Sequence, residues 1–420
     1  VGAKVSIVSR KVQTTRALVR GIALDGDAQI IFVDTPGIFA PRRRLDRAMV
    51  TTAWSGAGDA DAIAMLIDAG RGVDEEVEGI LAKLAEVRDL IGAPSDLPLI
   101  AADGTDTAAL AALAGRTKAV ITTAGPYQLY GAALVAACAA AGCDYVDLAG
   151  ESNWIAEMIA AHEATARATG ARLVFSCGFD SIPFDLGVWY AQREAAARFG
   201  APSKRVRGRV RGMQGTLSGG TFASGMATMM AAQRDPSVGV LLADPFALTP
   251  GFKGVAQPDG DTPYEDTVTG SWVGSFMMAG INTKAVHRTN FLMGNPWGAD
   301  FQYDEMMMLP GPPKSGGGGG GGFGLGGAAP PQPGEGPSRE EREAGNYDLL
   351  FIAEGPDGAT VRAAVKGDMD PGYGSTSKML SEAALALVFD VDRSVTPGGC
   401  WTPAAAMASA LLARLPARAG

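Results

Sequence analysis

Short apolar runs alternate with helix-like segments between residues 97 and 178. Gly142 and Gly170 follow two of these segments directly, in the position where a glycine commonly ends a helix. Strands that alternate with helices of this length indicate a parallel, doubly wound sheet. The pattern predicts strands at 97–103, 118–126, 144–150 and 171–178, and helices at 105–115, 131–141 and 152–169.

Other strand patterns lie outside this region. Residues 17–24 and 28–34 are apolar runs joined by Asp25-Gly26-Asp27, which predicts a hairpin. Residues 204–221 alternate strictly and place Arg205, Arg207, Arg209 and Arg211 on one face. This alternation predicts a strand of a more open, antiparallel sheet.

The remaining elements follow from local patterns. Residues 62–70 form an apolar, strand-like run, and 74–92 have a helical apolar face. A low-complexity Gly/Pro loop at 312–338 precedes a hairpin-like pair at 347–355 and 360–368. Helices are predicted at about 375–388 and after residue 402. We therefore expect a mainly parallel Rossmann-like sheet with a second α+β domain.

Composition and charge argue against several classes of function. The chain has 420 residues and a net charge of −9, which argues against nucleic-acid binding. Four cysteines without metal-ligand spacing predict reduced, buried thiols of a cytoplasmic protein and no metal site. No run reaches the roughly 18 apolar residues of a membrane span. The first residue is Val, which indicates a processed chain or an incomplete reading frame.

Two segments near the start carry nucleotide-switch motifs. They read "VGAKVSIVSRKVQTTRALVRGI" and "IIFVDTPGIFAPRRRLDRAM". Over residues 1–85 the chain resembles an Era-type ribosome-assembly GTPase. The resemblance implies that Thr14 or Thr15 reaches Mg²⁺, that Asp34 holds the ion through water, and that Thr35 and Gly37 belong to the γ-phosphate sensor.

Two parts of such a GTPase are not found. A Gly-x-x-x-x-Gly-Lys-Ser/Thr loop would lie before residue 1, and no Asn-Lys-x-Asp guanine-binding motif follows. Because these motifs supply most contacts to the nucleotide, we do not expect GTP or Mg²⁺ to bind.

The rest of the chain carries a second set of motifs. They include "AVITTAGPYQLYGAALVAACAAAGCDYVDLAGE", "ARLVFSCGFDSIPFDLG" and "DPGYGSTSKMLSEAALAL". From about residue 83 to 420 the chain resembles the saccharopine-dehydrogenase-like oxidoreductases, in particular the trans-acting enoyl reductase branch. The resemblance implies an NAD(P)-binding Rossmann domain and an inserted substrate domain. The family's opening Gly-x-x-Gly-x-x-Gly unit is not found, so we expect NADPH affinity to be weaker than micromolar.

The two resemblances meet near "LAKLAEVRDLIG". One explanation is a recombined or misassembled reading frame, which we favour. The other is a genuine fusion, in which residues 28–34 serve as the first parallel strand and 34–37 replace the glycine loop.

The expected cofactor contacts lie at strand ends. Asp103 ends one strand and is equally well explained as a helix N-cap. The next strand runs into "TTAGPYQLYG", which the resemblance places beside the nicotinamide ribose. We therefore expect cofactor contacts from Thr123, Gly125, Pro126 and Tyr127.

The catalytic residue is not determined by the sequence, and three candidates remain. Asp180 and Ser181 precede Pro183 and suit helix capping, while the resemblance makes them candidates to line the site. His287 has polar neighbours that suit acid-base chemistry, although a solvated loop explains it equally well. The arginine face at 205–211 suits a phosphate, but a solvated strand face is the commoner explanation.

We expect four parts: a GTPase fragment (1–85), a Rossmann-like domain (86–200), a substrate and dimer domain (201–368), and C-terminal helices that pack back (369–420). The expected function is NAD(P)H-dependent reduction of a lipid-like acyl substrate, in a chain whose competence the missing loop puts in doubt. The alternatives are a GTP-binding ribosome-assembly fragment and a non-catalytic scaffold. A homodimer and peripheral membrane contact are both compatible with the sequence.

Overall fold

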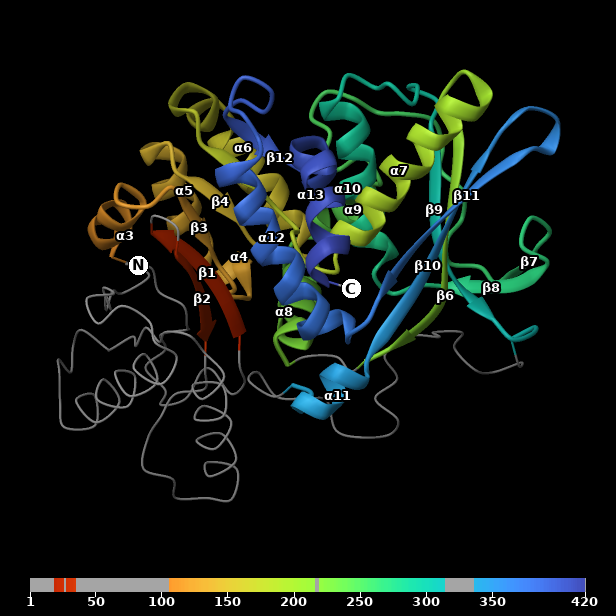
Figure 1. The fold of residues 1–420 in the computed structure, drawn as a ribbon, viewed down its shortest axis with the longest axis horizontal. Helices are drawn as coiled ribbons and strands as arrows, with labels where there is room; N and C mark the ends of the chain where they lie inside the picture. Colours follow the sequence, from red (N-terminus) through yellow and green to blue (C-terminus); the bar gives the residue numbers. More distant parts are fainter. Residues whose placement is uncertain (1–18, 26–27, 35–105, 216–218, 314–335, 420) are drawn as a thin grey trace.

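The computed structural model describes residues 19–25, 28–34, 106–215, 219–313 and 336–419 (Figure 1). The predicted N-terminal hairpin is confirmed: β1 (Val19–Asp25) pairs antiparallel with β2 (Ala28–Asp34). The fusion hypothesis places residues 28–34 in the parallel sheet, and this is wrong because their described partner is β1. The elements expected at 62–70, 74–92 and 97–103 lie outside the described residues.

A four-stranded parallel sheet forms the first half of the molecule. Its strand order is β12-β5-β4-β3, and every pairing is parallel. The strands are β3 (Ala119–Ile121), β4 (Asp144–Val146), β5 (Arg172–Val174) and β12 (Gly399–Trp401). The doubly wound α/β expectation is confirmed for β3 to β5, and β12 is an addition from the C-terminal region.

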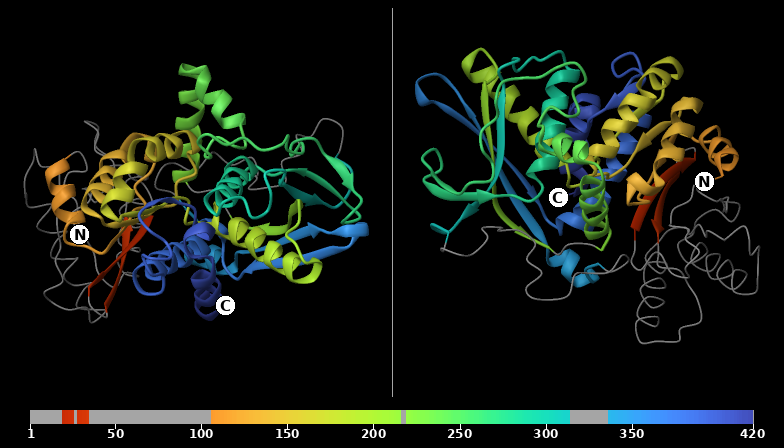
Figure 2. Two further views of the ribbon diagram at one scale, coloured as in Figure 1. Left: turned by 90° about the horizontal axis from the view of Figure 1, so that it is seen from above. Right: turned by 180° about the vertical axis from the view of Figure 1, so that it is seen from behind.

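Helices cover both faces of this sheet. The predicted segments form α3 (Thr107–Ala114), α5 (Ala132–Ala141) and α6 (Ser152–Thr169). Gly142 and Gly170 end α5 and α6 with φ of 69° and 86°, which is left-handed backbone that favours glycine. On the opposite face lies α12 (Thr376–Phe389), which contacts β3 and β4 (Figure 2).

A six-stranded mixed sheet forms the second half. Its order is β11-β10-β6-β9-β8-β7. The expectation of an antiparallel sheet is wrong in one place, because β6 pairs with β9 in parallel. The strands are β6 (Arg205–Gln214), β7 (Tyr264–Asp266), β8 (Ser271–Ser275), β9 (Gln302–Leu309), β10 (Asn346–Glu354) and β11 (Thr360–Gly367).

The other helices join or cover the sheets. The predicted strand at 204–221 ends early, because Gly219 begins α8. The pair α8–α9 projects from the body of the molecule (Figure 2). These helices are α4 (Tyr127–Tyr130), α7 (Ile182–Phe199), α8 (Gly219–Arg234), α9 (Pro236–Ala243), α10 (Ala279–Leu292), α11 (Arg339–Ala344) and α13 (Pro403–Ala419), with short turns at Pro356–Gly358 (3₁₀) and Pro371–Ser375 (π).

The main core lies where α7 crosses the mixed sheet. Phe184 of α7 packs edge-on against Phe351 of β10, with ring centroids 6.3 Å apart. Gly187 permits this approach, since a Cβ there would lie 2.2 Å from the Phe351 ring. The four cysteines are buried free thiols, as predicted. No helix among the described residues combines the length and apolar character that crossing a lipid bilayer needs.

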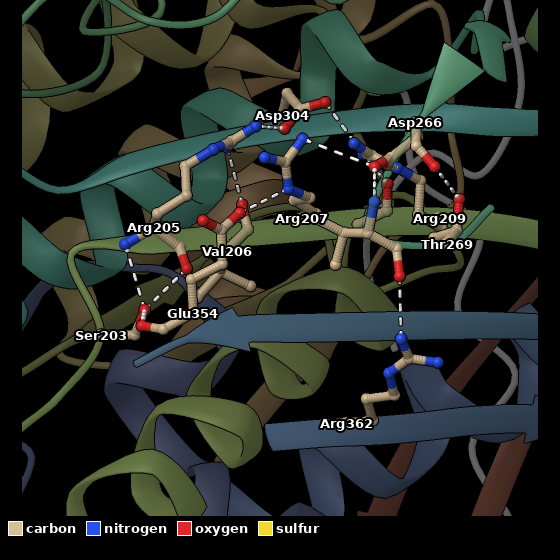
Figure 3. A network of polar contacts seen from close by, with 12 residues as sticks. Ser203, Arg205, Val206, Arg207, Arg209, Asp266, Thr269, Asp304, Glu354 and Arg362 are labelled. Carbon is tan, nitrogen blue, oxygen red and sulfur yellow. Dashed lines mark hydrogen bonds and ion pairs between the residues drawn. The ribbon is translucent and has the colours of Figure 1, made fainter. Parts of the chain in front are cut away.

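The arginines of β6 form a network of ion pairs (Figure 3). Arg209 donates to Asp266 at 2.8 Å and to Asp304 at 2.9 Å, and its side chain is fully buried. Arg205, Arg207 and Arg211 pair with Asp304, Glu354 and Asp348 respectively. The carboxylates occupy the guanidinium groups, so the row does not describe a phosphate site. The solvated-face interpretation is wrong for Arg205, Arg207 and Arg209, whereas Arg211 is 34% exposed.

Candidate functional site

A cavity of about 460 Å³ lies at the carboxyl edge of the parallel sheet. Three loops reach it, one after each of β3, β4 and β5. This edge is where ligands bind in open α/β sheets. The other walls come from α8, α10 and the segment that runs from the π-helical turn into α12. Among the lining residues are Thr123, Gly125, Tyr127, Leu148, Glu151, Asp180, Ser224, Met278, Ile281, Lys284, Tyr373 and Leu380.

The loop after β3 is fixed by Tyr127. Its hydroxyl donates to the carbonyl of Thr122 at 3.0 Å and accepts from the amide of Leu148 at 3.4 Å. Its own amide donates to Glu151 Oε1 at 2.8 Å. Burial raises the pKa of the Tyr127 hydroxyl well above its usual range. Tyr127 therefore joins the first two loops and stays protonated.

Asp147 joins the loops after β4 and β5. Its carboxylate accepts from the hydroxyl of Tyr145 at 2.9 Å and from the amides of Ala149 and Ser176 at 3.1 and 2.9 Å. Burial raises the Asp147 pKa to about 7, which these hydrogen bonds oppose. Its contacts are all to the scaffold, so Asp147 positions the loops.

The loop after β5 carries Asp180 and Ser181. Ser181 occupies the N-cap position of α7, but its side chain makes no capping hydrogen bond. The capping interpretation is therefore wrong. Among the described residues, neither Asp180 Oδ1 nor Ser181 Oγ has a hydrogen-bond partner, although both atoms are buried. Burial raises the Asp180 pKa to about 7.

A buried carboxyl group lies behind this loop. Glu305 of β9 accepts from the amide of Asn282 and from the hydroxyl of Tyr303, each at 2.9 Å. Burial is the largest effect and raises the Glu305 pKa to about 8; the two hydrogen bonds oppose this shift, and the charge of Asp180 contributes to it. Such an interaction is felt only at short range, so Glu305 and Asp180 are electrostatic neighbours.

His287 does not join the other candidates. It lies in the middle of α10, not in a solvated loop, and it is absent from the cavity lining. Its ring packs between Phe246 and Phe301, with centroid distances of 4.7 and 5.8 Å. Burial, followed by the charge of Lys284, lowers the His287 pKa to about 3. The imidazole is therefore neutral at physiological pH.

Comparisons with known proteins identify the family of this chain. A Mycobacterium tuberculosis protein named as a trans-acting enoyl reductase is 39% identical over 364 residues, covering 80% of this chain and 87% of its own. The trans-acting enoyl reductase of Mycobacterium ulcerans is 38% identical over 365 residues with the same coverage. The chain belongs to the trans-acting enoyl reductase family. It is thus an oxidoreductase by family, as the motifs in residues 83–420 predict.

The start of this enoyl reductase relative matches a different family. Residues 1–96 fit the model described as 50S ribosome-binding GTPase, which confirms the resemblance of the opening segment. Thr14, Thr15, Thr35 and Gly37 lie outside the described residues, and Asp34 is described only as the end of β2.

Solved structures align with the chain only at low similarity. Saccharopine dehydrogenase from Saccharomyces cerevisiae aligns with a TM-score of 0.42 and 11% identity, over 80% of this chain and 90% of its own. An engineered D-amino acid dehydrogenase bound to NADP⁺ aligns with a TM-score of 0.32 and 13% identity, over 77% and 87%. The strand order given above therefore remains the description of the fold.

The structure gathers some of the expected contact residues and omits others. Thr123, Gly125, Tyr127 and Asp180 line the cavity, while Pro126 is the N-cap residue of α4 and Asp103 lies outside the described residues. Ser181 is buried and does not line the cavity.

Two ionisable residues that line the cavity, Glu151 and Lys284, were not among the predicted site residues. Glu151 follows the strand end "DLAG", where a search for acids at strand ends would have found it. Lys284 lies one turn before His287 and was treated only as its neighbour. No group of three or more metal-ligating side chains is arranged for an ion within the described ranges.

Proposed function

We propose that this enoyl reductase relative uses NAD(P)H to reduce an apolar, lipid-like acyl substrate. The observation that carries the proposal is the cavity at three successive strand ends, in which buried polar atoms of Thr123, Glu151 and Asp180 have no partner among the described residues. Buried polar atoms are costly without hydrogen bonds, so their presence at a cavity supports a ligand that completes them. Apolar side chains from Leu148, Met278, Ile281 and Leu380 suit an acyl chain.

The described residues fit the nicotinamide riboside half of the cofactor. Thr123 Oγ1 and Glu151 Oε2 can accept from the ribose hydroxyls and carboxamide N–H groups. Gly125 also lines the cavity and presents only backbone to a ligand. Lys284 is the one cation among the described lining residues, so contacts to the pyrophosphate would come from elsewhere. A bound dihydronicotinamide would supply the hydride.

Asp180 is suited to hold the proton that a reduction consumes. With a pKa of about 7, its carboxyl group is protonated in a large fraction of molecules at neutral pH. The protonated fraction falls as the pH rises above 7. Ser181 follows it in the chain and has a buried Oγ without a described partner, but it does not line the cavity, so Asp180 is the residue assigned to the proton.

A fluorescence titration of the full chain with NADPH tests the proposal. We expect a saturable signal, and a weaker one in Thr123→Val, which removes one acceptor without changing side-chain shape. An unchanged affinity in Thr123→Val would contradict the assigned place of the cofactor. Titration with octanoyl and 2-octenoyl thioesters, with NADPH oxidation as the readout, then tests the substrate class.

GTP binding is the second candidate, because residues 1–96 match the GTPase model. A parallel titration with a fluorescent GTP analogue separates the two. Saturable binding of GTP without NADPH would overturn the reductase proposal in favour of a GTPase-related role. If neither nucleotide binds, a non-catalytic scaffold replaces both.

We propose the cytoplasm as the location, supported by the four buried free thiols. An acyl molecule, and not a nucleic acid, is the proposed partner, in keeping with the net charge of −9. Sedimentation and vesicle flotation test the homodimer and the peripheral membrane contact, which both remain proposals.

A further inference from the structure

Lys284 places a buried ammonium group in the wall of the cavity. Its side chain is only 3% exposed. Nζ donates to the carbonyl of Gly280, one turn earlier in α10, at 2.6 Å, and to the carbonyl of Leu242 in α9 at 2.7 Å. An ammonium group has three N–H donors. Two carbonyls hold it in place and leave one donor for a further acceptor.

No acidic side chain among the described residues forms a close ion pair with Lys284. Asp244, at the end of α9, attracts Lys284 but pairs with Lys253 at 3.5 Å. The neutral His287 faces it from one turn further along α10. Burial is the larger effect and lowers the Lys284 pKa to about 8. A buried cation without a close carboxylate is expensive unless a ligand compensates it.

The lining residues near Lys284 indicate the chemistry of a ligand that would accept its third N–H. Leu242, Met277, Met278 and Ile281 surround this end of the cavity with apolar side chains. Gly280 is open, since a Cβ there would meet no atom within 4 Å. The wall therefore suits an oxygen acceptor that is attached directly to a hydrocarbon chain.

We propose that Lys284 forms a subsite that binds the carbonyl or carboxylate oxygen of a medium-chain acyl group. This inference rests on the proposed function, because it assigns the acyl end of the same cavity. It adds a residue that the fold alone does not assign. The acceptor is held by the third N–H of Nζ, while Leu242 and Gly280 keep the side chain oriented.

Calorimetric titration of the full chain without cofactor tests the subsite. The ligands are octanoate, the octanoyl thioester of N-acetylcysteamine, and octanol as the control without a carbonyl. In Lys284→Met we expect octanoate affinity to fall at least tenfold and octanol affinity to stay unchanged. A loss with octanoate alone identifies a free-acid site, and a loss with both acyl ligands identifies a general acyl site. Equal octanoate affinity in wild type and Lys284→Met overturns the proposal, as does a wild type that binds no octanoate.

The pH dependence separates binding from a purely structural role. Octanoate affinity of the wild type should fall as the pH rises through about 8, because Lys284 loses its charge. Glu151, Asp180, Asp244 and His287 also face this region, and all four are present in Lys284→Met. A fall in affinity near pH 8 that the wild type shows and Lys284→Met lacks is therefore assigned to Lys284. If the profiles coincide, the lysine only ties α9 to α10.

Two controls protect the interpretation. Lys284→Arg keeps the charge and should retain most of the octanoate affinity, and the octanol control reports on an intact cavity in every variant. The NADPH titration is independent of these measurements. Octanoate binding that depends on Lys284 without NADPH binding would sink the reductase proposal and leave the subsite standing. The reverse result would remove the subsite alone.

Discussion

The arginine network of β6 and the wall of the cavity are two buried polar regions that differ in one respect. In the network, Arg209 is fully buried and both of its carboxylate partners lie within 2.9 Å. In the wall, Thr123, Glu151 and Asp180 bury oxygen atoms that have no hydrogen-bond partner among the described residues. The two regions are carried by neighbouring sheets of one chain.

The difference distinguishes buried polar groups that stabilise the fold from those that are available to bind a ligand. A buried polar group that is satisfied within the protein contributes to a unique structure, whereas an unsatisfied one lowers stability until something binds. The network is therefore structural, although four arginines on one strand suggest a ligand site. The cavity wall, whose residues resemble ordinary turns and caps in sequence, is the region that we propose to be functional.

The largest effect is expected from breaking the network at its centre. Arg209→Met leaves Asp266 and Asp304 without their buried partner, which we expect to lower the free energy of unfolding by about 3–5 kcal/mol. Urea denaturation of the variant and wild type measures the change. A loss below about 1 kcal/mol would show that the network behaves like a surface ion pair.

Glu305→Gln sharpens the comparison through pH. The Glu305 pKa is raised from about 4.5 to about 8, so its contribution to stability is fully present below about 4.5 and is lost as the pH rises to about 8. The variant should therefore lose less thermal stability than wild type over this window. Asp147, Asp180 and Asp185 have raised pKa values too, so part of the slope remains. Parallel slopes of melting temperature against pH would contradict the assignment.

Thr123→Val tests the opposite behaviour of the wall. It removes a buried hydroxyl that lacks a partner, so stability should rise by about 1 kcal/mol while NADPH affinity falls. Thermal denaturation and the fluorescence titration measure the two effects. A stability loss would mean that the hydroxyl has a protein partner and belongs with the satisfied groups.

The smallest effect is expected at the end of the arginine row. Arg211 is 34% exposed and pairs with the similarly exposed Asp348. Arg211→Ala should change stability by only about 0–1 kcal/mol, because exposed pairs gain little over their hydrated groups. The same urea experiment compares it with Arg209→Met. Equal losses would show that burial does not control the strength of the row.

Local signals were enough for the strands and helices between residues 106 and 178. Gly142 and Gly170 end their helices in left-handed backbone, which the sequence shows directly. β9 was missed because Asp304 and Glu305 interrupt an apolar run, and their partners lie on other elements. β12 was missed because it is only three residues long, begins with Gly399 and shows no strand pattern.

The site was less predictable because distant segments assemble it. Asp180 and Ser181 precede a proline as helix caps do, and only the structure shows that their side chains make no cap. Glu151 and Lys284 line the same cavity, although they lie 133 positions apart in the sequence. His287 has polar neighbours in sequence, but in α10 its ring packs against Phe246 and Phe301 instead.

The late position of β12 has a consequence for how the protein is made. Gly399 pairs with Arg172, so the edge of the parallel sheet is completed by residues synthesised after the whole mixed sheet. Gly398 seats this strand, since a Cβ there would lie 2.2 Å from the carbonyl of Ala166. During translation, more than 200 residues are synthesised after β5 before its partner strand β12 is available to pair with it. Contacts of such long sequence separation form slowly, so the nascent chain presents an open strand edge that a chaperone can recognise until its last segment arrives.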